Sequence, residues 1–274
     1  MHYIHNIDPF LIKFPEYFVI SGIRWYGVAY LVGFLVGWGL LGWYRREGRV
    51  GWTKEVEGEL LSALVVGVLV GGRLGYLIFY DFLHFMKEPW IFFKFWDGGI
   101  SGMSSHGGIL GVAVVLLWFS KKYGYSIFFL GDILGTVATP GLFFGRIANF
   151  VNGELWGRVT DVSWAVIFPN SMPGTPLALI SPRHPSQLYE AILEGLIPFV
   201  YLQWRFWRTR VIKERPGQLI GEFFILYSVA RIVVECFREP DAALIIGLTR
   251  GQFYSLFSLI FGLYLVLRAR WKAV

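Results

Sequence analysis

The stretch IFFLGDILGTVATPGLFFGRIANFVNGELWGR, residues 127–158, decides the fold. Its apolar beginning is about as long as a helix that crosses a bilayer, roughly 20 residues, and it then presents Arg146, Asn149, Asn152 and Glu154. A cation costs about 2–4 kcal/mol at the centre of a membrane span and less near an interface, so Arg146 is a functional-site candidate. Arg146 and Asn149 share a helical face at i, i+3. A guanidinium beside amides at the edge of a membrane suits capture of a lipid phosphate.

Composition extends this interpretation to the whole chain. Of the 274 residues, 55% are hydrophobic and only 16% are charged, against about 25% charged in soluble domains. Apolar runs of spanning length recur, so we expect an all-α, polytopic membrane bundle of about seven transmembrane helices. The expected spans are 25–44, 60–80, 106–120, 127–147, 187–207, 219–237 and 253–267, the third starting upstream near Ser101.

Basic residues predict the orientation of this bundle. They concentrate after the first, third and fifth spans and in the C-terminal tail, and they are sparse in the alternate loops. The positive-inside rule then places the N-terminus outside and the C-terminus in the cytoplasm, which requires an odd number of spans. The net charge of +6 is explained by topology and contact with anionic headgroups, so no nucleic-acid partner is expected.

The remaining global features are simple. One cysteine, Cys236, excludes a disulfide within the chain. The start MHYIHNIDPFLIKF has neither a basic n-region nor a small-residue cleavage site, so the first apolar run is expected to remain as a span. We predict one membrane domain, 1–274, in which the Pro- and Gly-rich segment 152–185 forms a small external cap.

A second constellation, Ser104-Ser105-His106-Gly107-Gly108, stands at the entry of the third span. A serine can cap the helix, and glycines allow close backbone approach. His106 is the natural candidate for proton transfer near neutral pH. The alternative is that the two glycines serve helix packing and His106 is an interfacial polar residue.

A third constellation lies on the sixth span and ends in Arg-Glu-Pro-Asp, residues 238–241. Tyr227, Arg231, Glu235 and Arg238 fall on one helical stripe. Arg231 is near mid-span, where an ion pair with Glu235 would make it tolerable. Such a pair is compatible with function, because Glu235 would orient Arg231 toward a phosphate.

Other polar positions are less specific. HPSQLYE, residues 184–190, opens the fifth span, and we expect a structural or headgroup-contact role for it. Tyr26, at the start of the first span, is a candidate among ordinary interfacial aromatic residues. Arg73, in the second span, belongs either to a cavity or to a pair with an acidic residue such as Asp132. The histidines and the cysteine have no ligand-like spacing, so no metal site is expected.

Together these residues carry a resemblance to a family. Gly145, Arg146, Asn149, Phe150, Asn152, Glu154 and Gly157 fill every position of a signature that closely resembles that of the bacterial prolipoprotein diacylglyceryl transferases. The His-Gly-Gly element, Tyr26, Tyr227, Arg231 and the Arg-Glu-Pro-Asp run also match. Ser105 departs from the family, where we expect a bulkier residue before the histidine.

The resemblance implies an activity. The protein would transfer the diacylglyceryl group of phosphatidylglycerol to the lipobox cysteine of a prolipoprotein signal peptide, in the bacterial inner membrane and without a cofactor. His106, Arg146, Arg231, Tyr26 and Tyr227 are the expected catalytic residues. The expected substrate-binding residues are Arg146, Asn149, Asn152, Glu154, Gly157 and Arg238. Asn149 and Glu154 would orient the headgroup or hold Arg146.

Two other classes remain open on the sequence. Arg73, Arg146 and Arg231 would suit a transporter or channel for an organic anion. Against this, no matching halves of the kind common in transporters are evident. A non-catalytic lipid-binding scaffold is the third possibility, and product formation by purified protein separates both from an enzyme.

Overall fold

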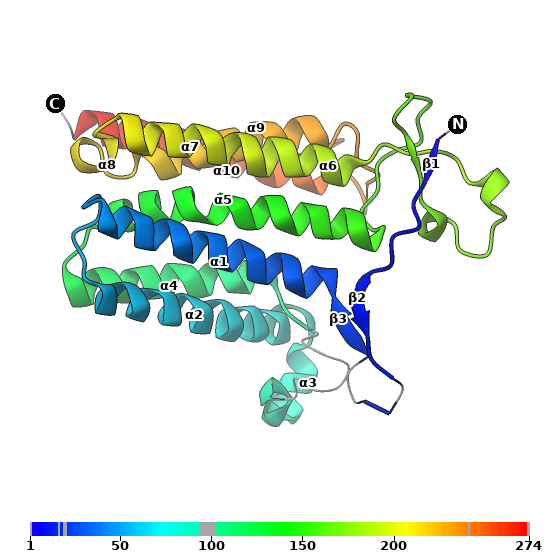
Figure 1. The fold of residues 1–274 in the computed structure, drawn as a ribbon. Coiled ribbons are helices and arrows are strands. Elements are labelled where there is room, and N and C mark those ends of the chain that lie inside the picture. Colours follow the sequence, from blue (N-terminus) through cyan, green and yellow to red (C-terminus); the bar gives the residue numbers. More distant parts are fainter. Residues whose placement is uncertain (1, 16, 19–20, 94–101, 241, 273–274) are drawn as a thin grey trace. The chain divides into compact units, whose positions relative to one another are not determined.

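Helices make up most of the chain in the computed structural model, which describes all residues except 1, 16, 19–20, 94–101, 241 and 273–274 (Figure 1). Ser101 and Asp241, which we assigned to the third span and the sixth-span motif, lie outside the described residues. The helices are α1 (Trp25–Arg46), α2 (Lys54–Tyr80), α3 (Phe82–Lys87), η1 (Pro89–Phe93), α4 (Ser105–Tyr123), α5 (Ile127–Asn152), η2 (Pro169–Ser171), η3 (Leu177–Leu179), α6 (Ser186–Glu190), η4 (Ala191–Leu196), α7 (Ile197–Arg208), α8 (Val211–Glu214), α9 (Gln218–Val234) and α10 (Arg250–Trp271). The short strands are β1 (Tyr3–Ile4), β2 (Phe10–Lys13), β3 (Gly22–Arg24) and β4 (Val166–Ile167).

Each apolar run expected to span the membrane is helical over most of its length. Within the described residues, four helices are long and apolar enough to cross a membrane: α1, α2, α5 and α10. The chain is therefore a mostly helical, multi-pass membrane protein. α2 begins at Lys54 because the Thr53 hydroxyl caps it by accepting from the Val56 amide at 3.5 Å.

The chain divides into two compact units. The first contains Met1–Phe14, Gly22–Gly37 and Gly131–Val274, and the second contains Pro15–Ser21 and Trp38–Leu130.

In the second unit, α2 and α4 lie side by side (Figure 1). A Cβ on Gly107 would lie 2.2 Å from the Gly71 carbonyl oxygen, so glycine permits this close approach. The packing role considered for Gly107 is confirmed. Arg73 is buried in this unit, where it donates to the carbonyls of Ile91 and Gly102.

In the first unit, α9 packs against α10 and α7 (Figure 1). It also packs against η4. Gly217, at φ 99°, directly precedes α9, and a carboxylate on α5 accepts from amides at this end of the helix. The buried Asp132 carboxylate accepts from the amides of Gly217 at 2.7 Å and Ile220 at 2.8 Å. Asp132 thus acts as a distant N-cap that fixes α9 against α5.

The segment 152–185 is mostly irregular and is joined to the N-terminus. β4 pairs in parallel with β1, with Tyr3 opposite Val166. The His5 amide continues this pairing by donating to the Ile167 carbonyl at 2.9 Å. The His5 ring is 5% exposed and packs edge-on against Phe150 of α5, so the segment is anchored to the end of the helix that carries Arg146.

Candidate functional site

Residues 187–207, expected from the sequence as the fifth span, do not form one regular α-helix, because η4 is a π-helical turn between α6 and α7. The Ile197 amide donates to the carbonyl of Ile192, five residues back. Pro198 explains the widened turn: it has no N–H for the Glu194 carbonyl, and its ring would clash with that carbonyl in an α-helix. The turn carries Glu194 and directly follows Glu190, and both side chains are 0% exposed.

Close packing places this turn against α5. A Cβ added to Gly195 would lie 2.7 Å from both the Cα and the N of Phe143. Only glycine allows η4 to approach the α5 backbone this closely. Phe143 lies one helical turn before Arg146, so the approach brings Glu190 and Glu194 into the range of that guanidinium.

Arg146 is held by both carboxylates. Its Nη1 lies 3.0 Å from Glu190 Oε2, and its Nη2 donates to Glu194 Oε2 at 3.1 Å. The Arg146–Glu190 contact is an ion pair without hydrogen-bond alignment. Glu190 Oε2 has no hydrogen-bond donor among the described residues.

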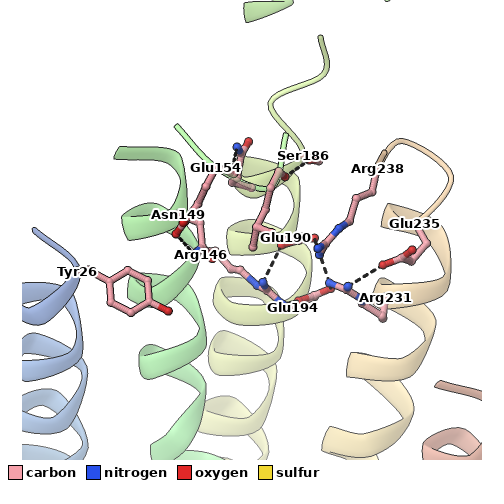
Figure 2. Close-up of polar contacts among 12 residues, drawn as sticks. Tyr26, Arg146, Asn149, Glu154, Ser186, Glu190, Glu194, Arg231, Glu235 and Arg238 are labelled. Carbon is pink, nitrogen blue, oxygen red and sulfur yellow. Dashed lines mark hydrogen bonds and ion pairs between the residues drawn. The ribbon is translucent and has the colours of Figure 1, made fainter. Parts of the chain in front are cut away.

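Arg231 reaches the same carboxylates from α9 (Figure 2). Its Nη1 donates to Glu190 Oε1 at 3.0 Å and to Glu194 Oε1 at 3.3 Å. Its Nη2 lies 2.6 Å from Glu235 Oε1, which confirms the i, i+4 pair expected from the sequence. Arg238 adds a further bond, from Nη1 to Glu190 Oε1 at 3.0 Å.

These contacts define one ionic cluster of six residues. They are Arg146, Glu190, Glu194, Arg231, Glu235 and Arg238. Three guanidinium groups meet three carboxylates, so the formal charge of the cluster is zero when all six are ionised. The arginine side chains are 20%, 13% and 7% exposed, which leaves Arg146 the most accessible cation. Such a cluster can present preorganised guanidinium groups to an anion.

A second polar group surrounds Glu154. Its Oε1 accepts from Asn149 Nδ2 at 2.9 Å and Asn152 Nδ2 at 3.3 Å. The sequence left open whether Asn149 and Glu154 hold Arg146; in the structure Arg146 pairs instead with Glu190 and Glu194. The next residue, Leu155, has φ 56°, a left-handed conformation uncommon outside glycine. Backbone strain of this kind often accompanies functional sites.

Gly157 connects the loop to the end of α9. Its amide donates to the His184 carbonyl at 2.9 Å, and it forms an isolated bridge with Arg238. An added Cβ would lie 2.5 Å from the Phe237 carbonyl oxygen, so the contact requires glycine. Burial lowers the pKa of His184 in this loop, which favours its neutral form.

Tyr26 and Tyr227, the two tyrosines expected in the site, both lie in the first unit. Tyr227 is half-buried on α9, one turn before Arg231, and its ring stacks on Phe223. The Tyr26 hydroxyl lies 3.2 Å from that of Tyr30. Figure 2 shows the Tyr26 ring on the α1 side of Arg146 and Asn149.

His106 lies in the second unit, at the start of α4. The helix is capped by the Ser104 hydroxyl, which accepts from the Gly107 amide at 3.3 Å. The His106 side chain is exposed. Its role as a base remains a prediction.

Sequence reasoning missed Glu194, and it gave Glu190 only the structural or headgroup-contact role expected for residues 184–190. One signal was available: a glutamate within an apolar span, four residues before a proline. An ionisable residue inside a span is a functional candidate by default. Its partners on α5 and α9 are 48 and 37 positions away, which local spacing does not reveal.

The apolar helices and the buried ionic cluster define a multi-pass membrane protein with a polar site suited to anions. Comparison with known families makes the class specific: residues 15–268 match the model of the prolipoprotein diacylglyceryl transferases, and the chain belongs to that family.

Curated relatives agree. The chain is 44% identical over 268 residues to a phosphatidylglycerol–prolipoprotein diacylglyceryl transferase of Vibrio atlanticus, covering 96% of this chain and 91% of the relative. It is 45% identical over 257 residues to that of Rhodospirillum centenum, covering 90% and 87%. The enzyme of Shewanella oneidensis is 41% identical over 275 residues, with 97% of each chain covered.

Proposed function

We propose that this chain transfers the diacylglyceryl group of phosphatidylglycerol to the thiol of a lipobox cysteine in a prolipoprotein. Family membership and the transferase activity named for the relatives support the reaction. The structural observation that carries the proposal is the pair Arg146 and Arg231, held on two helices by the same two buried carboxylates.

The reaction forms one bond and breaks one. The cysteine sulfur attacks the glycerol carbon of the lipid, and the bond between that carbon and the phosphate oxygen breaks. The electron pair of the broken bond remains on the phosphate, so glycerol phosphate leaves. The thiol proton passes through a base to the released phosphate or to water. The thiolate is the reactive nucleophile, so a base must act first or in concert.

Arg146 and Arg231 suit the growing negative charge on the departing phosphate. Preorganised cations in a site with little water stabilise such charge strongly. We assign the base to His106, with Tyr26 or Tyr227 as alternatives or partners. Asn149, Asn152, Glu154, Gly157 and Arg238 complete the proposed headgroup-binding surface.

The membrane arrangement belongs to the same proposal. The chain would form one domain, 1–274, of seven spans in the bacterial inner membrane, with its N-terminus outside and C-terminus in the cytoplasm. Residues 152–185 would be the external cap. The distribution of basic residues supports this orientation. Reactivity of single cysteines introduced at Ser171 and Lys213 toward a membrane-impermeant reagent, in a Cys236→Ser background, tests it.

An in vitro transfer assay tests the activity. Purified full-length protein receives phosphatidylglycerol and a fluorescent lipobox peptide, with the Cys→Ser peptide as the control. A lipid-shifted product that depends on the cysteine is expected. A folded preparation that binds the lipid and forms no product would favour the anion transporter or the lipid-binding scaffold.

A further inference from the structure

Glu190 and Glu194 already bind the guanidinium groups of Arg146 and Arg231, which the proposed reaction needs for the phosphate. Both carboxylates are fully buried, and each contacts Arg146 and Arg231 within 3.3 Å. A guanidinium has five N–H donors in a fixed fork. A phosphate that binds the two arginines bidentately therefore competes with these carboxylates for donors and for positive charge.

The charge of the cluster sharpens this competition. With six ionised groups its formal charge is zero, so an incoming anion finds cations that are already neutralised. In the proposed reaction the lipid phosphodiester carries one negative charge. The released phosphomonoester carries about −1.5 to −2 at neutral pH, because the second pKa of a phosphomonoester is about 6. Unopposed arginines would thus hold the product more tightly than the substrate.

We propose that Glu190 and Glu194 are positioning residues that compete with the phosphate for Arg146 and Arg231, and that this competition keeps the affinity for released glycerol phosphate low. The inference rests on the proposed function. It assigns two roles to the carboxylates: they fix the guanidinium groups before the lipid arrives, and they weaken product binding after transfer.

The backbone explains why these carboxylates stay in place. They project from α6 and the π-turn that Pro198 imposes, and Gly195 seats that turn directly on Phe143. Arg238, 7% exposed, also bonds Glu190 Oε1 at 3.0 Å, so Glu190 keeps a partner when Arg146 turns to the substrate. Buried carboxylates without such partners would be strongly unfavourable.

The decisive variant is Glu194→Gln, which removes a negative charge and keeps the shape. We expect the dissociation constant of sn-glycerol 1-phosphate, measured by calorimetry on the full-length protein in detergent, to fall by about tenfold or more. Its inhibition constant in the transfer assay should fall in parallel, and kcat should fall because product leaves more slowly. Glu194→Asp, which retains the charge, should stay near the wild-type dissociation constant.

Glu222→Gln is the matched control. Glu222 lies on the same helix as Arg231, about 13.5 Å along the axis at 1.5 Å per residue, and pairs with Arg205 at 2.8 and 3.0 Å. The Glu222→Gln substitution removes the same charge from an ion pair outside the cluster, so the affinity for glycerol phosphate should not change. Should Glu194→Gln fail to fold, Glu235→Gln removes the carboxylate 2.6 Å from Arg231 and tests the same charge balance.

Two results would overturn the inference. One is an unchanged or weakened affinity for glycerol phosphate in folded Glu194→Gln; the other is an equal gain in Glu222→Gln. If the wild type is active, either result would refute the proposed competition between the carboxylates and the phosphate and would leave the proposed function intact. A wild type that makes no transfer product sinks the proposed function, while the calorimetry still reports on the charge balance.

Discussion

Arg146 Nη2 donates to Glu194 Oε2 at 3.1 Å, a bond between residues 48 positions apart. It joins α5 to the π-turn that follows α6, and the same carboxylate also receives Arg231 from α9. The cations expected to bind phosphate are therefore fixed by tertiary contacts rather than by the local sequence around each arginine.

Replacing either arginine should abolish most of the transfer. Arg146→Ala and Arg231→Ala remove a preorganised cation from the leaving phosphate, so we expect kcat to fall about 100- to 1000-fold. Each change also leaves buried carboxylates short of a partner, so a lower Tm is expected. The transfer assay and thermal unfolding in detergent measure the two effects. Arg205→Ala, which breaks an ion pair outside the cluster, serves as the control, and near-native rates in both cluster variants would refute the phosphate clamp.

His106→Gln tests the proposed base. If His106 removes the thiol proton, the variant should lose about 100-fold or more in kcat. The limb of the pH–rate profile that reports the base should disappear as well. His84→Gln changes an exposed histidine that pairs with Asp81, and it should leave the profile intact. An active His106→Gln enzyme with a wild-type profile would move the assignment to Tyr26 or Tyr227.

Gly195→Ala tests geometry without changing charge. The added methyl would meet Phe143 Cα at 2.7 Å and push the π-turn away from α5. Small displacements of catalytic groups are costly, so we expect a loss of about 10- to 100-fold in kcat/KM. Gly39→Ala is the matched control on α1, because nothing lies within 4 Å of its added Cβ. Equal activity of the two variants would show that the close approach of η4 to α5 is dispensable.

His5 should make stability depend on pH. Burial against Phe150 and Phe168 lowers its pKa below the ordinary 6.5, and its Nε2 has no hydrogen-bond partner among the described residues. Below about pH 6.5 the unfolded chain takes up a proton at His5 that the folded chain resists, so stability is lost as the pH falls from that value. Above about pH 6.5 His5 is neutral in both the folded and the unfolded chain, so it adds no dependence of stability on pH.

Thermal unfolding between pH 7.5 and 5.5 measures this effect. His5→Asn should show a smaller fall in Tm than the wild type over that range. The comparison isolates His5, because burial lowers the pKa of His184 in the same direction in both proteins. Parallel curves for wild type and variant would contradict the prediction.

Local patterns in the sequence predicted a large part of this structure. Apolar length located the helices, and i, i+4 spacing anticipated the Arg231–Glu235 pair. Three features depend on tertiary packing: the Asp132 cap on α9, the β1–β4 pairing and the seating of Gly195 on Phe143. Each joins segments that are distant in the sequence, so no local periodicity predicts it. Glu194 was missed for the same reason, although Pro198 marked a disturbed helix four residues later.

Cys236, the chain's only cysteine, is exposed and directly follows Glu235 of the ionic cluster. A maleimide dye or nitroxide attached to the purified wild-type protein will therefore mark one position, at the edge of the cluster. Changes in its emission or mobility on adding glycerol phosphate would follow ligand arrival directly. The same thiol must become serine in any assay that counts modified cysteine, since it would otherwise compete with the peptide for the reagent.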